Sequence, residues 1–289
     1  MKNKKAKVKK SAVNHKRIRE VYEEAALEAR AMLDHLRVEI SKVKHRVLPP
    51  KKPTGNYKLV LTARLLEEML GENVTIGSLN LPAVKTCPGA MDCMTYCYAM
   101  QGRFAMTRTQ IIRFRNLLSL QDCDDMAKLL TREFVAWILG NSGGDKVVVL
   151  RLHDSGDFFS QEYVNAVAQA VSRTKVMLPE LLDHEVEFIP YAYTKSLHLD
   201  LSPLVNAGVR LVQSHGGKYD HLIDESLPIA QVFAKGAEIP DGWIDGQSEE
   251  HADTLAILGH KRIALSYHGN ATQPDLLRDR QVELYQIAG

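Results

Sequence analysis

Several features that would assign a chain to a class are missing from these 289 residues. No run approaches the roughly 18 apolar residues that a membrane helix needs. No apolar core follows the Lys-rich start, as a secretory signal would require. The sequence also has no internal repeat and no Gly-rich loop of the dinucleotide-binding pattern. We therefore expect a cytoplasmic protein that has no membrane partner.

Acidic side chains are absent from the first 19 residues. This segment holds seven Lys and two Arg, a charge of +9, whereas the whole chain carries only +2. Such a segment is typical of a disordered, solubilising tail. Lys also binds phosphate without reading sequence, so a nucleic-acid-binding arm is the second interpretation. Nuclear targeting and attraction to a membrane surface are the others.

Residues 20–56 follow the tail as a second unit. Apolar side chains recur in alternating steps of four and three from Tyr22 to Val47, with charged residues on the other faces. This spacing predicts one long amphipathic helix, which Pro49 and Pro50 end. A short linker then leads to a main domain that we expect over residues 57–289.

The main domain alternates short apolar runs with helical patterns. Strands are predicted at residues 74–80, 147–153, 186–193, 209–213, 229–233 and 263–267, and helices at 109–120, 124–139, 161–174 and 201–207. Continuous apolar strands separated by helices indicate an α/β fold with a parallel sheet. About six such units predict a full or partial β/α barrel. An open doubly wound sheet is the alternative.

Each apolar strand ends in residues that form hydrogen bonds, often before a glycine. The ends include His153 to Asp157, Tyr193 to Lys195, His215 and His268. Strand ends are commonly polar because they leave the core. Five polar strand ends in succession are more than this general tendency explains. The carboxyl ends of parallel strands also meet at one edge of the sheet. We therefore expect these residues to line one site.

The most specific local pattern contains three of the four cysteines. Cys87, Cys93 and Cys97 are spaced Cys-x5-Cys-x3-Cys directly after the first predicted strand, and Pro88 and Gly89 bend the chain between them. Three thiols this close suit a loop wrapped around a soft ion or an iron–sulfur cluster. The following Arg103, Arg108, Arg113 and Arg115 supply positive charge. The pattern therefore predicts a metal centre, with an iron–sulfur cluster as the first choice.

Other interpretations of the cysteines remain. A structural zinc site usually has four ligands in Cys-x2-Cys pairs, and this spacing does not supply them. Cys123 is available as a fourth ligand, although a small buried thiol is its commoner role. A disulfide is disfavoured in a cytoplasmic protein.

These motifs resemble two known groups of proteins. A cysteine loop after the first strand and a Ser-Gly-Asp turn after the second resemble radical S-adenosylmethionine (SAM) enzymes. The blocks Thr86-Cys87-Pro88-Gly89-Ala90, Cys97-Tyr98-Ala99, residues 151–160 and Tyr193-Thr194-Lys195-Ser196 resemble more closely the bacteriophage gene product 88 family. That similarity covers roughly residues 60–270. It implies expression inside an infected host cell.

The first resemblance also implies a cofactor arrangement. Cys87, Cys93 and Cys97 would hold a [4Fe–4S] cluster whose fourth iron binds SAM. Ser155, Gly156 and Asp157 would contact SAM, with Tyr193, Lys195, His215 and His268 around it. The loop is longer in both gaps than the usual Cys-x3-Cys-x2-Cys spacing, a change that cluster binding tolerates more readily than SAM chemistry does.

Two functional hypotheses follow. The first is a phage-type iron–sulfur protein that carries out SAM-dependent radical chemistry on a substrate that the sequence does not name. The second is a non-catalytic iron–sulfur or zinc protein that binds nucleic acid or a host protein.

Overall fold

The computed structural model describes residues 57–100, 102–234, 236–246 and 249–266, together with Glu20, Glu23, Glu24, Leu27 and Ala31. The basic tail, nearly all of the predicted first helix and linker, and the predicted site residue His268 lie outside the described residues. No helix that the structure describes is long and apolar enough to cross a membrane.

The described chain alternates helices and strands. The α-helices are α2 (Tyr57–Leu70), α3 (Thr107–Gln121), α4 (Met126–Asn141), α5 (Gln161–Leu181), α6 (Ser202–Asn206) and α7 (Glu249–Ile257). The strands are β1 (Val74–Leu79), β2 (Val147–Leu152), β3 (Glu187–Thr194), β4 (Arg210–Ser214), β5 (Ile229–Phe233), β6 (Ile244–Asp245) and β7 (Arg262–Ser266). Short 3-10 helices are η1 (Asp92–Tyr96), η2 (Tyr98–Met100), η3 (Gly102–Ala105) and η4 (Asp220–Leu222).

The strands form one parallel sheet, as predicted. Its order is β1-β2-β3-β4-β5-β7-β6, and every neighbouring pair is parallel. Strands β1 to β5 follow one another across the sheet, so right-handed crossovers put α5 and α6 on the same face. The direction reverses between β6 and β7, and the helix that connects them, α7, therefore lies on the opposite face.

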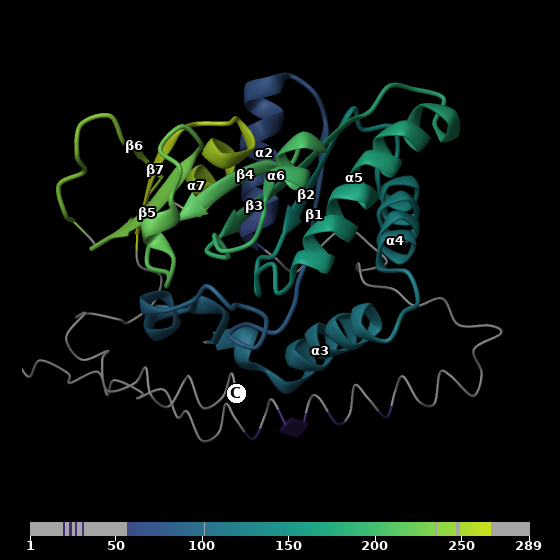
Figure 1. The fold of residues 1–289 in the computed structure, drawn as a ribbon. Helices are drawn as coiled ribbons and strands as arrows, with labels where there is room; N and C mark the ends of the chain where they lie inside the picture. Colours follow the sequence, from purple (N-terminus) through teal and green to yellow (C-terminus); the bar gives the residue numbers. More distant parts are fainter. Residues whose placement is uncertain are drawn as a thin grey trace, which may run out of the picture.

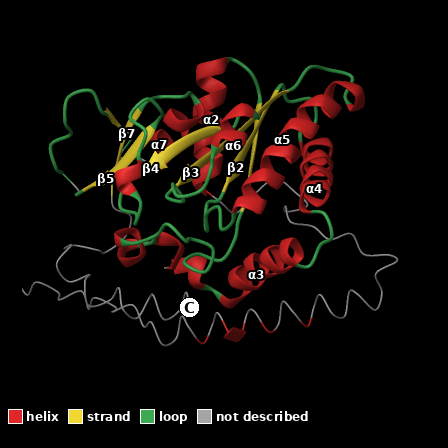
Figure 2. Cartoon of the chain, viewed as in Figure 1, coloured by secondary structure: helices red, strands yellow, loops and turns green. Residues whose placement is uncertain are grey.

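The predicted barrel is not confirmed, because the sheet is not closed and β1 and β6 form its two edges. The physical reason lies in two helices that cover the face that would line a barrel. Leu59 and Leu66 of α2 and Ile257 of α7 are fully buried in a cluster with Val149 and Ile189 of the sheet. Figures 1 and 2 show α4 and α5 on one side of the sheet and α2 and α7 on the other. The architecture is therefore an open sheet between two helical layers.

The segment between β1 and α3 lies across the carboxyl edge of the sheet (Figure 1). It carries η1, η2 and η3 and ends where α3 begins. A small core of its own holds this segment together, in which Met94, Met100, Phe114 and Leu118 are buried. The fold thus brings the cysteine segment to the edge where the parallel strands end.

Candidate metal centre

The three cysteines of the predicted loop line one cavity of about 200 Å³ at the carboxyl edge of the sheet. Residues from the ends of β2, β3, β4 and β7 and from α7 form its other walls. All three thiols are half-buried and free of disulfide bonds. Residues that are far apart in sequence therefore surround one group of thiols.

Short helical turns fix the cysteine loop. The Ala90 amide donates to the carbonyl of Cys87 at 3.0 Å, and the Met100 amide donates to that of Cys97 at 3.1 Å. Cys93 lies within η1 and Cys97 follows its last residue, and the Cys93 amide donates to the carbonyl of Gly216 at 3.2 Å. The loop is therefore attached to the segment that follows β4.

Gly89 holds the same loop against the end of β3. A Cβ at this position would lie only 1.9 Å from the carbonyl oxygen of Lys195. On the other side, the Lys218 amide donates to the Gly89 carbonyl at 2.9 Å, and Ala90 forms an isolated bridge with Gly217. Only glycine permits this close approach of two backbones, which explains its place two residues after the first cysteine.

Burial raises the pKa of all three thiols. For Cys87 the Asp157 carboxylate and the other two cysteines raise the pKa further. For Cys97 burial and Cys93 together raise the pKa to about 11. Without a bound cation the thiols are therefore protonated near neutral pH, and metal binding has to release their protons.

Two cationic side chains partly lower the raised pKa values of two of the thiols. The Lys195 ammonium partly lowers the raised pKa of Cys93, and Arg113 with Lys195 does so for Cys97. Arg113 comes from α3, is 2% exposed and donates to the Ala99 carbonyl at 3.3 Å. Of the other arginines predicted to supply charge, Arg103 and Arg108 are exposed, and Arg115 interacts with Glu133. Arg113 is thus the one of that group that acts on the thiols.

The Ser155-Gly156-Asp157 turn lines the cavity, but its polar groups have partners within the protein. The Ser155 hydroxyl donates to the Leu81 carbonyl at 2.8 Å. Asp157 accepts hydrogen bonds from the Thr194 hydroxyl at 2.7 Å, the Lys195 amide at 2.8 Å and the Phe158 amide at 2.8 Å. The turn therefore joins the ends of β1, β2 and β3, and its predicted contact with SAM stays a prediction.

Gly156 is also part of this scaffold. Its φ is +88°, a conformation that favours glycine, and a Cβ would lie 2.6 Å from the Thr86 hydroxyl and 2.7 Å from the Leu81 Cβ. The turn is therefore packed directly beneath the start of the cysteine loop.

The predicted histidines have different positions. His153 lines the cavity, is 4% exposed, and its Nε2 lies 2.9 Å from the Tyr163 hydroxyl. Burial and then Arg151 lower the pKa of His153 to about 3, so the ring is neutral. His215 is not among the lining residues, and its Nδ1 lies 3.5 Å from the Asp220 carboxylate at the rim. His268 lies outside the described residues.

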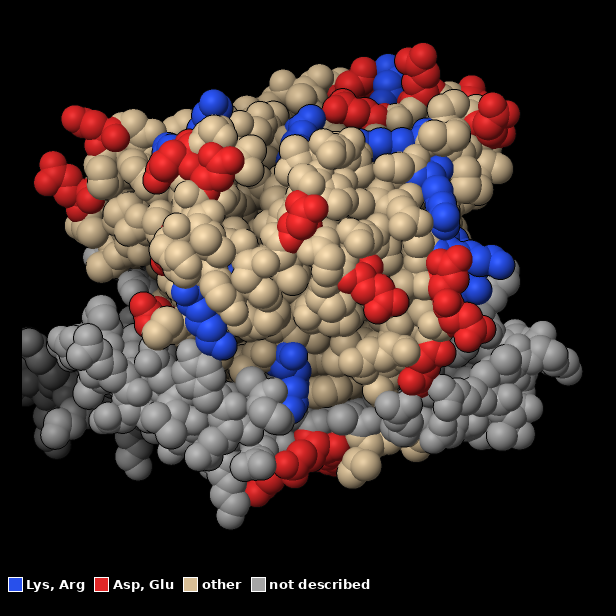
Figure 3. Space-filling model, viewed as in Figure 1, with Lys and Arg blue, Asp and Glu red and all other residues tan. Residues whose placement is uncertain are grey.

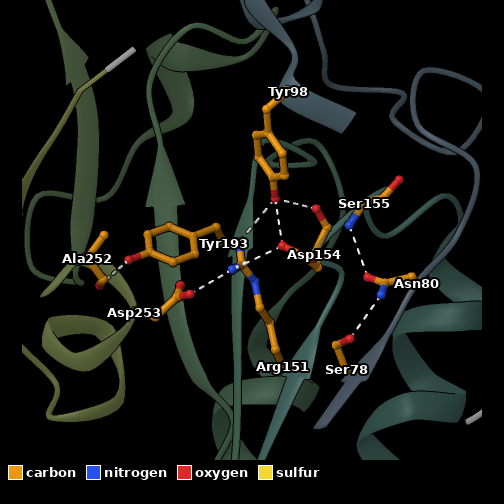
Figure 4. A network of polar contacts seen from close by, with 9 residues as sticks. All are labelled: Ser78, Asn80, Tyr98, Arg151, Asp154, Ser155, Tyr193, Ala252 and Asp253. Carbon is orange, nitrogen blue, oxygen red and sulfur yellow. Dashed lines mark hydrogen bonds and ion pairs between the residues drawn. The ribbon is translucent and has the colours of Figure 1, made fainter. Parts of the chain in front are cut away.

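A buried ionic network forms the cavity wall next to the third cysteine (Figure 4). Arg151 Nη1 lies 2.8 Å from Asp253 of α7 and 3.1 Å from Asp154. The Tyr98 hydroxyl, one residue after Cys97, donates to Asp154 Oδ1 at 2.8 Å. Tyr193, a predicted site residue, donates a hydrogen bond from its hydroxyl to the Ala252 carbonyl at 2.6 Å.

The charges in this network support one another. Burial disfavours the charge of Arg151, but the carboxylates of Asp253 and Asp154 keep its pKa well above the ordinary value. Burial, and next the Asp154 carboxylate, raise the pKa of Tyr98, which stays protonated. The network therefore connects the cysteine loop, β2 and α7 through charges that remain buried together.

Sequence reasoning did not identify Asp253 or the role of Tyr98. One signal was present: Arg151 interrupts the otherwise apolar β2, all of whose residues are buried. A charge in a strand covered on both faces needs a buried partner, although the sequence does not say which residue provides it.

Cys123 does not line the cavity. It lies just after α3, and its thiol is 3.2 Å from the Leu120 carbonyl. Within the part of the chain that the structure describes, no group of three or more His, Cys, Asp or Glu side chains is arranged to hold a single metal ion. The thiols of a four-iron cluster bind separate irons and therefore lie further apart than ligands of one ion.

Charged side chains are mixed on the face shown in Figure 3, where Lys and Arg lie scattered among Asp and Glu. The segment predicted to bind nucleic acid, residues 1–19, lies outside the described residues.

Comparison with protein families gives one match. The family model described as gene product 88 matches residues 50–279, which is most of the chain. No curated protein matches the sequence.

Proposed function

This chain belongs to the gene product 88 family, and we propose that its Cys87, Cys93 and Cys97 hold an iron–sulfur cluster that faces a small-ligand cavity. The observation that supports this most strongly is that three half-buried thiols of one short loop line a single cavity. Thiolate is the donor that iron–sulfur clusters use. Ordinary packing of cysteine gives no reason for three thiols to meet in one cavity wall.

The surroundings of the thiols suit a cluster. Buried thiolates need nearby positive charge, and Lys195 and Arg113 provide it from two different elements. The backbone amide and glycine contacts of the loop hold its shape before any cofactor binds. These contacts support the proposal because they keep the loop, and with it the three thiols, at one cavity.

The number of ligands favours an iron–sulfur cluster with one open iron over structural zinc. Structural zinc takes four protein ligands, whereas the cavity offers three thiols and Cys123 lies elsewhere. A four-iron cluster held by three cysteines leaves one iron free to bind a small molecule. Such a cluster would supply one-electron chemistry to a ligand in the cavity.

The chain's own residues have separate tasks in this proposal. The network of Arg151, Asp154 and Asp253 keeps a polar wall of the cavity in place next to the third cysteine. SAM is the ligand that the sequence resemblance suggests. Its predicted partners Ser155 and Asp157 are bound within the protein, so we assign no SAM contact to them.

Single substitutions test the ligand set. After anaerobic purification, Cys87→Ala, Cys93→Ala and Cys97→Ala should each abolish the visible absorption of the cluster, and Cys123→Ala should leave it intact. Loss of the cluster in Cys123→Ala would indicate a closed site with four thiolates, which has no open iron. In that case the ligand-binding part of the proposal fails and an electron-transfer or structural role remains.

Addition of SAM to the reduced protein tests the finer hypothesis. A change in the electron paramagnetic resonance signal, with release of deoxyadenosine or methionine, would support radical chemistry. An unchanged signal at saturating SAM would remove SAM from the proposal and leave the cluster assignment standing.

A further inference from the structure

Lys195 has an unusual environment for a lysine at the end of a strand. Its ammonium Nζ lies 2.6 Å from the Ser214 hydroxyl, and the side chain is half-buried in the cavity wall. Among the described residues no carboxylate forms an ion pair with it. The Ser214 hydroxyl is the hydrogen-bond partner of this ammonium, and the Asp157 carboxylate interacts with it only through space.

Two acidic groups in the neighbourhood of Lys195, Asp157 and Asp220, have hydrogen-bond donors of their own. Asp157 receives three hydrogen bonds, one of which comes from the backbone amide of Lys195 itself. Asp220 receives the amides of Gly216 at 2.9 Å and Gly217 at 2.9 Å. Both carboxylates therefore hold backbone turns in place, and the Lys195 side chain is directed to other groups.

The cysteine loop is the neighbour that remains. Gly216 lies beside both Lys195 and the loop. A Cβ on Gly216 would lie 3.8 Å from Lys195 Cε and 3.9 Å from the amide nitrogen of Cys93. The Lys195 backbone also touches Gly89 of the loop. Lys195 and the second cysteine thus border the same spot beside Gly216, and Lys195 lines the cavity that all three thiols share.

We propose that Lys195 is the counter-charge of the bound cluster and raises its reduction potential. This inference rests on the proposed cluster. Each added electron increases the negative charge of a cluster with thiolate ligands, so a fixed cation nearby favours the reduced form. Lys195 acts through the electrostatic field at the irons, and it is a positioning residue rather than a ligand.

A redox titration of Lys195→Met and Lys195→Arg against wild-type protein tests the inference. In the Met variant the ratio of reduced to oxidised cluster at a fixed potential should fall about tenfold, a shift of about 59 mV to more negative potential. The Arg variant keeps the charge and should recover most of the wild-type value. Lys128→Met, an exposed lysine of α4, is the matched control and should not change the potential.

The outcomes are distinct. A Met variant that contains the full cluster at the wild-type potential overturns the role of Lys195 and leaves the cluster proposal intact. If Lys195→Met assembles no cluster, Lys195→Arg decides the outcome. A cluster in Lys195→Arg supports a role of the positive charge. Absence of the cluster in Lys195→Arg as well overturns that role and shows that the side chain is needed for packing. Wild-type protein that binds no iron and sulfide overturns both proposals together.

Discussion

Replacement of Gly89 by alanine is a direct test of how the cysteine loop is held. The new Cβ would lie 1.9 Å from the Lys195 carbonyl oxygen and 2.5 Å from its carbon, whereas ordinary contact begins near 3.4 Å. Both atoms belong to the backbone of β3 and its end, so no side chain can rotate away. The loop and the strand end therefore have to separate by about 1.5 Å, the difference between those two distances.

Such a separation has a calculable cost. Overpacking of this kind costs about 1–3 kcal/mol. Movement of the loop also breaks the hydrogen bond from the Lys218 amide to the Gly89 carbonyl, worth about 1 kcal/mol. The total of about 2–4 kcal/mol is small compared with unfolding the sheet, so we expect the loop to detach locally while the remaining fold persists.

The assay compares bound iron with stability. Gly89→Ala should lose most of its bound iron and expose its thiols to alkylation, with little change in far-ultraviolet circular dichroism. The control is Gly140→Ala in α4, where a Cβ meets nothing within 4 Å and alanine should stabilise the helix by about 0.5–1 kcal/mol. Full iron content and an unchanged unfolding midpoint in Gly89→Ala would refute the reasoning.

Three further predictions concern other parts of the chain. Arg151→Met leaves two buried carboxylates without their cation and should cost about 3–5 kcal/mol in urea unfolding. Arg210→Met removes the surface ion pair of Arg210 with Glu187 and should cost less than about 1 kcal/mol, so equal effects of the two substitutions would contradict this. In metal-free protein the alkylation rate of Cys97 should rise with pH up to about 11, because burial raises its pKa to that value, and a plateau by pH 9 would show an ordinary thiol. Deletion of residues 1–19 should leave the melting temperature nearly unchanged and weaken any salt-sensitive binding to DNA or RNA; a large loss of stability would instead give the tail a structural role.

The sequence was informative about the strands and less so about how they assemble. Long apolar runs such as residues 147–153 predict a strand buried on both faces, and β2 is one. That pattern is the same in a barrel and in an open sheet, so it could not exclude closure. The two residues of β6 form no apolar run, and nothing in the sequence distinguished them. Helix α2 was not predicted, although Leu59 and Leu66 lie on its buried face.

For the site, too, the sequence predicts which residues come together better than it predicts their contacts. The spacing of Cys87, Cys93 and Cys97 predicts a shared centre because ligands of one loop are close by necessity. The parallel strands explain why Tyr193 and Lys195 join them in one cavity. Hydrogen-bond partners are not visible in a sequence, so the role of Asp157 in holding the turn after β2 could not be predicted, and its predicted contact with a ligand stays a prediction.

The central claim is that this loop holds an iron–sulfur cluster, and metal analysis of anaerobically purified protein tests it most directly. We predict about four iron and about four acid-labile sulfide ions per chain, both lost in Cys93→Ala and both retained in Cys123→Ala. Stoichiometric zinc without sulfide, or the same metal content in the two variants, would contradict the account.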